Sequence, residues 1–97
     1  MHGKAMVSEP HFVLYSKLGC HLCEGLEEKL RQIPAVAASL EIRDIASREA
    51  WLARYRLEIP VLCWVEGDRE TELPRFSPRA TVAQIQVRLR RYVRDSD

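Results

Sequence analysis

The 97-residue sequence predicts a small α/β domain whose strands and helices follow one another in the order β-α-β-α-β-β-α. Two short runs, residues 12–15 and 61–65, are wholly apolar, as in strands that are covered on both faces. A third segment, residues 40–45, alternates apolar and polar side chains with the period of a strand. Two further stretches, which begin near Leu22 and Thr81, repeat apolar residues at helical spacing.

The first half of the chain predicts a central strand, a helix and a strand nearer the edge of the sheet. Residues 12–15 begin just after Pro10 and form the central strand. The helix that follows has an apolar face made of Leu22, Leu26, Leu30 and Ile33. Pro34 ends it, because proline cannot continue a helix. Residues 40–45 form the next strand, with one face buried.

The second half predicts a short helix, a hairpin and a terminal helix. We expect Ser47 to cap the short helix, which ends before the Ile59–Pro60 pair because a residue that precedes proline avoids helical angles. The strand at 61–65 is followed by turn-forming residues, so residues 69–73 return antiparallel to it. Thr81 and Gln84 have the spacing of a capping box at the start of the last helix.

Composition and charge limit the functional classes. An apolar share of 46% with 30% charged residues is typical of a soluble globular protein, and the length fits one domain over 1–97, with flexible ends at 1–9 and 95–97. The net charge of +1 provides no field that would attract nucleic acid or anionic lipid. Neither a signal peptide nor a membrane-spanning run is evident. We therefore expect a cytoplasmic monomer that binds neither nucleic acid nor membranes.

A pair of cysteines lies where the first strand gives way to the first helix, after the turn residue Gly19. Cys20 and Cys23 are three helical steps apart, which leaves them close enough to form a disulfide. Cys20 is predicted at the helix N-terminus, where free N–H groups and the helix dipole favour a thiolate, so it is the expected nucleophile. Cys23 lies one turn further on, on the buried face, and is the expected resolving cysteine.

A pair of cysteines at this spacing is also half of many zinc sites. Structural zinc usually takes four ligands, and the sequence has no second Cys-x-x-Cys or Cys/His pair at a suitable spacing. The pattern therefore favours redox chemistry, and no residue is assigned as a metal ligand. Cys63 lies inside an apolar strand, where a cysteine commonly packs as a small buried hydrophobic residue.

The segment Tyr15–Cys23 resembles the active-site segment of glutaredoxins, and Ile59–Pro60 resembles their cis-proline element. The resemblance covers nearly the whole chain and is strongest to the small glutaredoxin-like proteins of bacteria, within the thioredoxin superfamily. It implies a thioredoxin-like fold with a four-stranded mixed sheet and flanking helices. It also implies that Pro60 is cis and adjacent to Cys20, that the backbone of Ile59 offers strand-like hydrogen bonds to a thiol peptide, and that Lys17 contacts a carboxylate of glutathione.

The sequence departs from the glutaredoxin pattern at two places. His21 and Leu22 stand between the cysteines in place of the usual proline and aromatic pair. A protonated His21 would favour the Cys20 thiolate, and the alternative is an exposed residue at the helix start. Residues 76–81 replace the glycine pair and polar helix start that receive the glutamyl end of glutathione, and only Thr81 keeps a capping role.

These observations predict a dithiol thiol-disulfide oxidoreductase that acts through Cys20 and Cys23, with substrate contacts from Lys17, His21, Ile59 and Pro60. No tightly bound cofactor is expected. The resemblance implies that glutathione or protein disulfides are the partners and that glutathione or a thioredoxin-type reductase restores the dithiol. The alternative is a non-catalytic module of the same fold that senses redox state or holds a metal.

Overall fold

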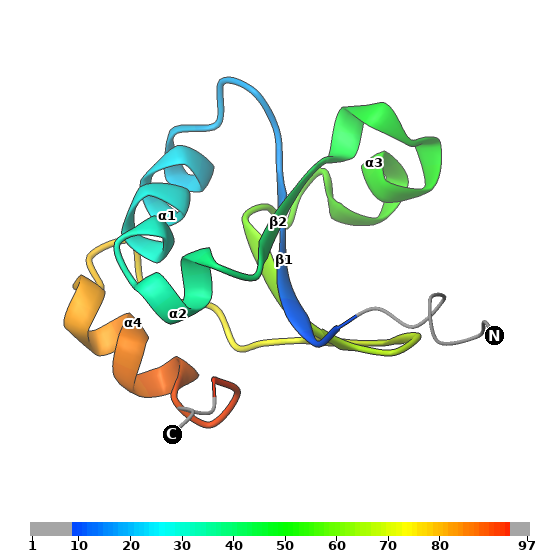
Figure 1. Cartoon of the computed structure of the whole chain (residues 1–97). Helices are drawn as coiled ribbons and strands as arrows, with labels where there is room; N and C mark the ends of the chain where they lie inside the picture. The colour runs from blue at the N-terminus through cyan, green and yellow to red at the C-terminus, as the bar shows by residue number, and fades with distance from the viewer. Residues whose placement is uncertain (1–8, 94–97) are drawn as a thin grey trace, which may run out of the picture.

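A four-stranded mixed sheet forms the centre of the computed structural model, which describes residues 9–93 (Figure 1). The strands are β1 (His11–Ser16), β2 (Leu40–Asp44), β3 (Val61–Glu66) and β4 (Arg69–Glu72), in the order β2-β1-β3-β4. β1 runs parallel to β2 and antiparallel to β3, and β4 runs antiparallel to β3. The predicted fold class and the central position of the first strand are confirmed. The ends expected to be flexible lie outside the described residues, except for Glu9.

Helices cover both faces of this sheet. They are α1 (His21–Arg31), α2 (Pro34–Ala37), α3 (Glu49–Tyr55) and α4 (Val82–Leu89), with one 3-10 turn, η2 (Ile45–Ser47). Figure 1 shows α1, α2 and α4 grouped on one side and α3 on the other. Within residues 9–93, every helix is too short or too polar to cross a membrane.

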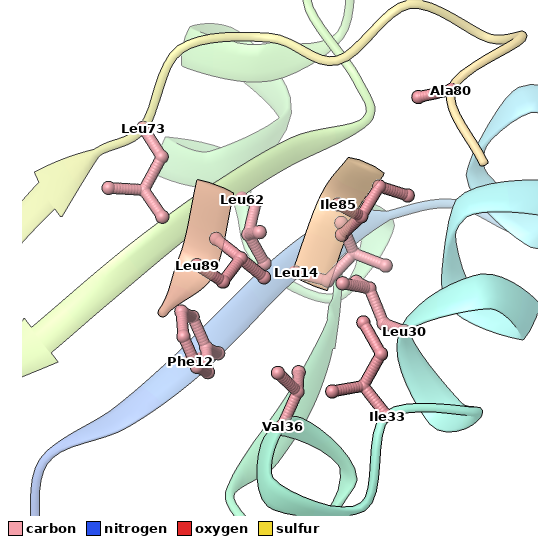
Figure 2. Close-up of a cluster of buried hydrophobic side chains, with 10 residues drawn as sticks. All are labelled: Phe12, Leu14, Leu30, Ile33, Val36, Leu62, Leu73, Ala80, Ile85 and Leu89. Carbon is pink, nitrogen blue, oxygen red and sulfur yellow. The ribbon is translucent and has the colours of Figure 1, made fainter. Parts of the chain in front are cut away.

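The larger core lies between the sheet and the helices α1, α2 and α4. Successive strand residues point to opposite faces, so Phe12 and Leu14 of β1 enter this core while their neighbours do not. They meet Leu30 of α1 and Ile85 of α4, which are fully buried. Figure 2 shows these side chains converging between the strands and the helices. This packing fixes α1 against β1.

The smaller core lies between the other face of the sheet and α3. Val13 and Tyr15 of β1 point into it, together with Cys63 of β3. The ring of Tyr15 stacks on that of Tyr55 from α3, with centroids 4.3 Å apart. Tyr15 thus joins the sheet to the short helix α3 by contacts with two of its aromatic side chains, Tyr55 and Trp51.

A hydrogen-bonded network crosses this face from β2 to β4. The Arg43 guanidinium donates Nη1 to the Tyr15 hydroxyl (2.7 Å) and to Glu70 (2.8 Å), and Nε to Glu41 (2.8 Å). The Tyr15 hydroxyl donates to Glu70 at 2.8 Å. The hydrogen bond from Arg43 lowers the pKa of Glu41. Burial raises the pKa of Glu70, but the hydrogen bonds from Arg43 and Tyr15 outweigh it and leave that pKa below its usual value.

The expected cap of the short helix was wrong. Ser47 does not cap the helix after β2: its hydroxyl donates to the carbonyl of Asp44 at 2.6 Å, and the N-cap position belongs to Arg48. The reason is that the Asp44 carboxylate accepts the N–H of Ala46 at 2.9 Å, which starts the turn η2 at once. The first helix ends before Pro34, as expected, but Pro34 also opens a further helix, α2, which the sequence did not predict.

Leu22 also departs from its expected place on the buried face of the first helix. Its side chain is 56% exposed, whereas Leu30 on the same helix is fully buried. The inward position in the first turn is taken by Cys23. At the other end of the chain, the capping box of α4 is confirmed: Thr81 accepts the N–H of Gln84 at 3.1 Å, and Gln84 accepts that of Thr81 at 2.9 Å.

Replacing Leu30 with alanine should lower the free energy of unfolding by about 2–5 kcal/mol, because truncation of a fully buried leucine leaves a cavity. The matched change Leu22→Ala, on the same helix but at an exposed site, should change it by less than about 0.5 kcal/mol. Urea denaturation followed by circular dichroism measures both values. Equal losses in the two variants would contradict this division of α1 into buried and exposed leucines.

The Arg43 network should make the protein less stable in acid. The pKa values of Glu41 and Glu70 are lower in the folded than in the unfolded chain, so both carboxylates stabilise the fold above their unfolded pKa of about 4.3. That contribution disappears as the pH falls through the folded values. Between pH 7 and pH 3, the double variant Glu41→Gln/Glu70→Gln should therefore lose less unfolding free energy than the parent. If denaturation curves show the same loss of unfolding free energy in the parent and in the double variant, the two carboxylates do not cause the instability in acid.

Candidate redox site

The two cysteines of the Cys-x-x-Cys segment meet at the start of α1. Cys20 is the N-cap residue, and its extended backbone (φ −90°, ψ 103°) leads directly into the helix. Its Sγ accepts a hydrogen bond from the backbone N–H of Cys23 at 3.2 Å. The two side chains form a disulfide, with their Cα atoms 5.2 Å apart. Cys23 is fully buried while Cys20 is partly exposed, so outside reactants reach only the first sulfur.

The local sequence explains why Cys20 takes this position. Gly19 has a φ of +84°, in the left-handed region that favours glycine, and so allows the tight turn after β1. The turn is closed by a hydrogen bond from the N–H of Cys20 to the carbonyl of Lys17 at 3.1 Å. A sulfur at an N-cap faces the free N–H groups and the positive end of the helix dipole. The arrangement therefore stabilises a thiolate on Cys20 once the disulfide is reduced.

The Ile59–Pro60 segment joins α3 to β3, and its peptide bond is cis. The carbonyl of Tyr55 accepts the N–H groups of Glu58 (2.7 Å) and Ile59 (3.1 Å). The N–H of Ile59 is thus engaged within its own loop, and the Ile59 side chain packs toward the α3 side of the sheet. Pro60, in contrast, lines a cleft, and His21 is another of the residues that line it.

The structure brings some of the sequence-predicted site residues together and leaves others apart. Cys20 and Cys23 are bonded, and His21 and Pro60 line the same cleft. The His21 side chain is 96% exposed, and its Nδ1 lies 3.8 Å from a carboxylate oxygen of Glu24. Lys17 is exposed in the turn before Cys20 and, like Ile59, does not line the cleft.

The cleft that His21 and Pro60 line has a volume of about 380 Å³, and neither Cys20 nor Cys23 is among its lining residues. One wall is the first half of α1, with Leu22 and Leu26, and a second is the loop that contains Pro60. The third wall is the segment between β4 and α4, which contributes residues 73–78. Its volume lies in the range of ordinary ligand pockets.

Two basic side chains hold the third wall in place. The Lys29 ammonium donates to the carbonyls of Pro78 (2.9 Å) and Ala80 (2.7 Å), which ties the segment to α1. The Arg75 guanidinium donates to the carbonyl of Glu58 at 2.6 Å, which ties it to the loop before Pro60. Sequence reasoning missed Lys29 and Arg75, because a basic residue that binds a distant carbonyl has no signature in the sequence.

The remaining thiol and the acidic residues offer no second site. Cys63 is 1% exposed on the α3 side of the sheet, and burial raises the pKa of its thiol to about 12. The structure thus agrees with its assignment to the core. In the described part of the chain, no three His, Cys, Asp or Glu side chains gather into a set that would hold a metal ion.

Two solved structures share this architecture. The Northeast Structural Genomics target XcR50 from X. campestris is 29% identical, with a TM-score of 0.57, over 80% of this chain and 93% of its own. Trxlp from Edwardsiella tarda EIB202 is 19% identical, with a TM-score of 0.55, over 90% of this chain and 88% of its own. At the latter identity the likeness concerns the fold alone. No curated protein matches the chain.

The family model of the Glutaredoxin-like domain (DUF836) matches residues 11–90. This range runs from the first residue of β1 to just beyond α4 and contains both cysteines of the disulfide as well as Pro60. The match agrees with the resemblance carried by the residues around Cys20 and with the observed sheet. The chain therefore belongs to the glutaredoxin-like domain family.

Proposed function

We propose that this protein is a thiol-disulfide oxidoreductase in which Cys20 and Cys23 carry out exchange by a dithiol mechanism. One observation carries the proposal: Cys20 is a partly exposed residue whose sulfur caps α1 and accepts the N–H of Cys23, while its bonded partner Cys23 is fully buried. The site thus has one sulfur that meets substrates and one that is confined to reacting with the first. This asymmetry is what a nucleophile and a resolving thiol require.

The reaction proceeds in two exchange steps. The Cys20 thiolate attacks one sulfur of a substrate disulfide, so that a mixed disulfide forms and the other substrate sulfur leaves as a thiolate. Cys23 then gives up its proton to solvent and attacks the Cys20 sulfur, which re-forms the internal disulfide and releases the first substrate sulfur. Two electrons pass from the cysteine pair to the substrate. The 5.2 Å Cα–Cα separation supports the second step, because it lies within the normal range for a disulfide.

The internal disulfide must be reduced before the next cycle. Within this proposal, glutathione or a thioredoxin-type reductase supplies the two electrons, and no tightly bound cofactor takes part. The exposed Lys17 and His21 lie on either side of Cys20 in the sequence, where positive charge would favour its thiolate. We assign the reaction to a monomer in the cytoplasm, a compartment in which protein disulfides are mostly transient and catalytic.

Single serine variants should separate the roles of the two thiols. Cys20→Ser should abolish the catalysed reduction of bis(2-hydroxyethyl) disulfide with dithiothreitol as electron donor, leaving only the direct reaction between the two reagents, because the attacking thiolate is lost. Cys23→Ser should trap a mixed disulfide on Cys20, visible as a mass increase of one substrate half. The matched control Cys63→Ser should keep the parental rate, because that thiol is buried on the far face of the sheet.

Two outcomes would count against the enzyme. A parent protein that forms and breaks its internal disulfide reversibly but does not turn over the small disulfide would be a redox-sensing module. Equal activity in Cys20→Ser and the parent would remove the proposed nucleophile altogether.

Alkylation of the fully reduced protein should discriminate among the three cysteines. Near neutral pH, iodoacetamide should modify Cys20 first, because its sulfur is the accessible one and the N-cap position favours the thiolate. Cys23 and Cys63 should be protected by burial until urea is added. Peptide mass spectrometry measures the order of labelling. Faster labelling of Cys23 would reverse the assigned roles.

A further inference from the structure

We propose that one face of the β3–β4 hairpin, beside the end of α4, binds a small molecule in which an aromatic ring is joined to one anionic group. The site is a cleft of about 330 Å³, here called the hairpin cleft. In the described part of the chain it is lined by Trp64, Glu66, Arg69, Thr71, Arg91 and Tyr92. These residues differ from those that line the cleft of His21 and Pro60, so the inference is independent of the proposed exchange reaction.

The register of the hairpin explains why four of these side chains lie together. Trp64 is paired with Thr71, and Glu66 is paired with Arg69. Because every second residue of a strand points to the same face, these four residues project from one side of the hairpin. Trp64 packs against the larger core, so this is the side of the sheet on which α1, α2 and α4 lie.

The end of α4 completes the cleft. The helix stops at Leu89, and the next residues form a turn in which the N–H of Tyr92 donates to the carbonyl of Leu89 at 3.0 Å. This turn brings the Tyr92 ring next to that of Trp64, with ring centroids 5.4 Å apart. Because the helix ends here, Trp64 is not sealed beneath it and remains partly exposed.

The two aromatic rings give the cleft a preformed apolar wall. The ring planes of Trp64 and Tyr92 are inclined at 43°. Both rings rest on the fully buried ring of Phe12, whose centroid lies 4.8 Å from that of Trp64 and 6.2 Å from that of Tyr92. Rings that are held by such packing lose little side-chain freedom when a ligand binds. An aromatic ligand can therefore pack against this wall, stacked or edge to face, at a low entropic cost.

Two arginines supply the positive charge of the hairpin cleft. Arg69 and Arg91 are exposed, and neither forms an ion pair within residues 9–93. The Arg91 guanidinium lies over the Tyr92 ring, 5.7 Å from its centroid. A guanidinium stacked on a ring keeps N–H groups along its edge, which match the paired oxygens of a carboxylate or a phosphate. These cations are thus available to a ligand, unlike Lys29 and Arg75, which donate to backbone carbonyls.

Charge and size narrow the ligand to one anionic group. Glu66 shares the described lining with the two arginines, which leaves an excess of one positive charge. A second anionic group would approach the Glu66 carboxylate, and the like charges would repel each other. The volume of about 330 Å³ lies at the lower end of the range for small-molecule pockets, about 300–1,000 Å³. One ring system with its charged substituent fits this space, whereas a polyanionic chain does not.

The test is an NMR titration of the ¹⁵N-labelled full-length protein. Nucleoside monophosphates and aromatic carboxylic acids share the required chemistry, so the charged probes are adenosine 5′-monophosphate and phenylacetate. Their neutral counterparts are adenosine and phenylacetamide, and inorganic phosphate supplies the charge without a ring. The sequence contains two tryptophans, so the variant Trp51→Phe assigns the indole N–H signal of Trp64. Trp51 packs on the α3 side of the sheet and serves as the internal reference.

At least one charged probe should shift the Trp64 indole signal and the amide signals of Thr71 and Arg91 in a saturable way. Its dissociation constant should be at least about tenfold lower than those of its neutral counterpart and of inorganic phosphate, because the cleft holds both ring and charge. The Trp51 indole signal should not move. Tighter binding of adenosine 5′-monophosphate would assign the ligand to the nucleotides, and tighter binding of phenylacetate would assign it to the aromatic acids.

Variants then locate the effect on the protein. Arg69→Gln and Arg91→Gln should each weaken binding of the charged probe by about threefold to tenfold, because a charge-assisted hydrogen bond is lost, and should leave binding of its neutral counterpart unchanged. Arg90→Gln is the matched control. It removes the same charge from a neighbouring residue, which lines a different cleft with Leu89 and Val93, and should keep the parental dissociation constants. Circular dichroism of each variant establishes that it is folded.

Three results would overturn the inference. Neutral counterparts or inorganic phosphate that bind as tightly as the charged probes would leave only a ring-binding or an anion-binding surface. An equal loss of affinity in Arg90→Gln and Arg91→Gln would mean that only the overall charge of the protein matters. The absence of a saturable shift with either charged probe up to about 10 mM would exclude the site. None of these results bears on the exchange reaction of Cys20 and Cys23.

Discussion

The packing of α1 against β1 is the constraint on which the redox site depends. Leu30 is fully buried against Phe12 and Leu14, which lie on an interior strand of the sheet. With the helix axis fixed at that contact, its first turn can only begin beyond the end of β1, where Cys20 caps it. The burial of Cys23 and the partial exposure of Cys20 then follow from their positions on the first helical turn. The difference in accessibility between the two cysteines is thus a consequence of core packing.

Much of the fold could be predicted from the sequence, because a buried strand or helix face requires apolar residues at a characteristic spacing. The runs at 12–15 and 61–65 and the stripe after Thr81 are each long enough for that period to be read. The elements α2 and η2 could not be predicted, since a turn of three or four residues is decided by single hydrogen bonds such as that of Asp44. Leu22 was placed on the buried face because the spacing of apolar residues does not distinguish a helix face that packs against the core from one that lines a cleft.

The candidate site divides in the same way. The bonding of Cys20 to Cys23 and the N-cap position of Cys20 followed from spacing along one helix, which is a local property. The cleft was not foreseen, because it depends on contacts between segments far apart in the chain, such as that of Arg75 with Glu58. The cleft is therefore the less predictable half of the candidate site: it requires the third wall, whereas the disulfide requires only the start of α1.

The edge strand β4 limits how another chain can approach the sheet. All four of its residues are exposed, and three of them are charged: Arg69, Glu70 and Glu72. Charged side chains on a short edge strand oppose the addition of a further strand, because each would be desolvated in the new pairing. This edge is thus protected against the intermolecular β-pairing that leads to aggregation.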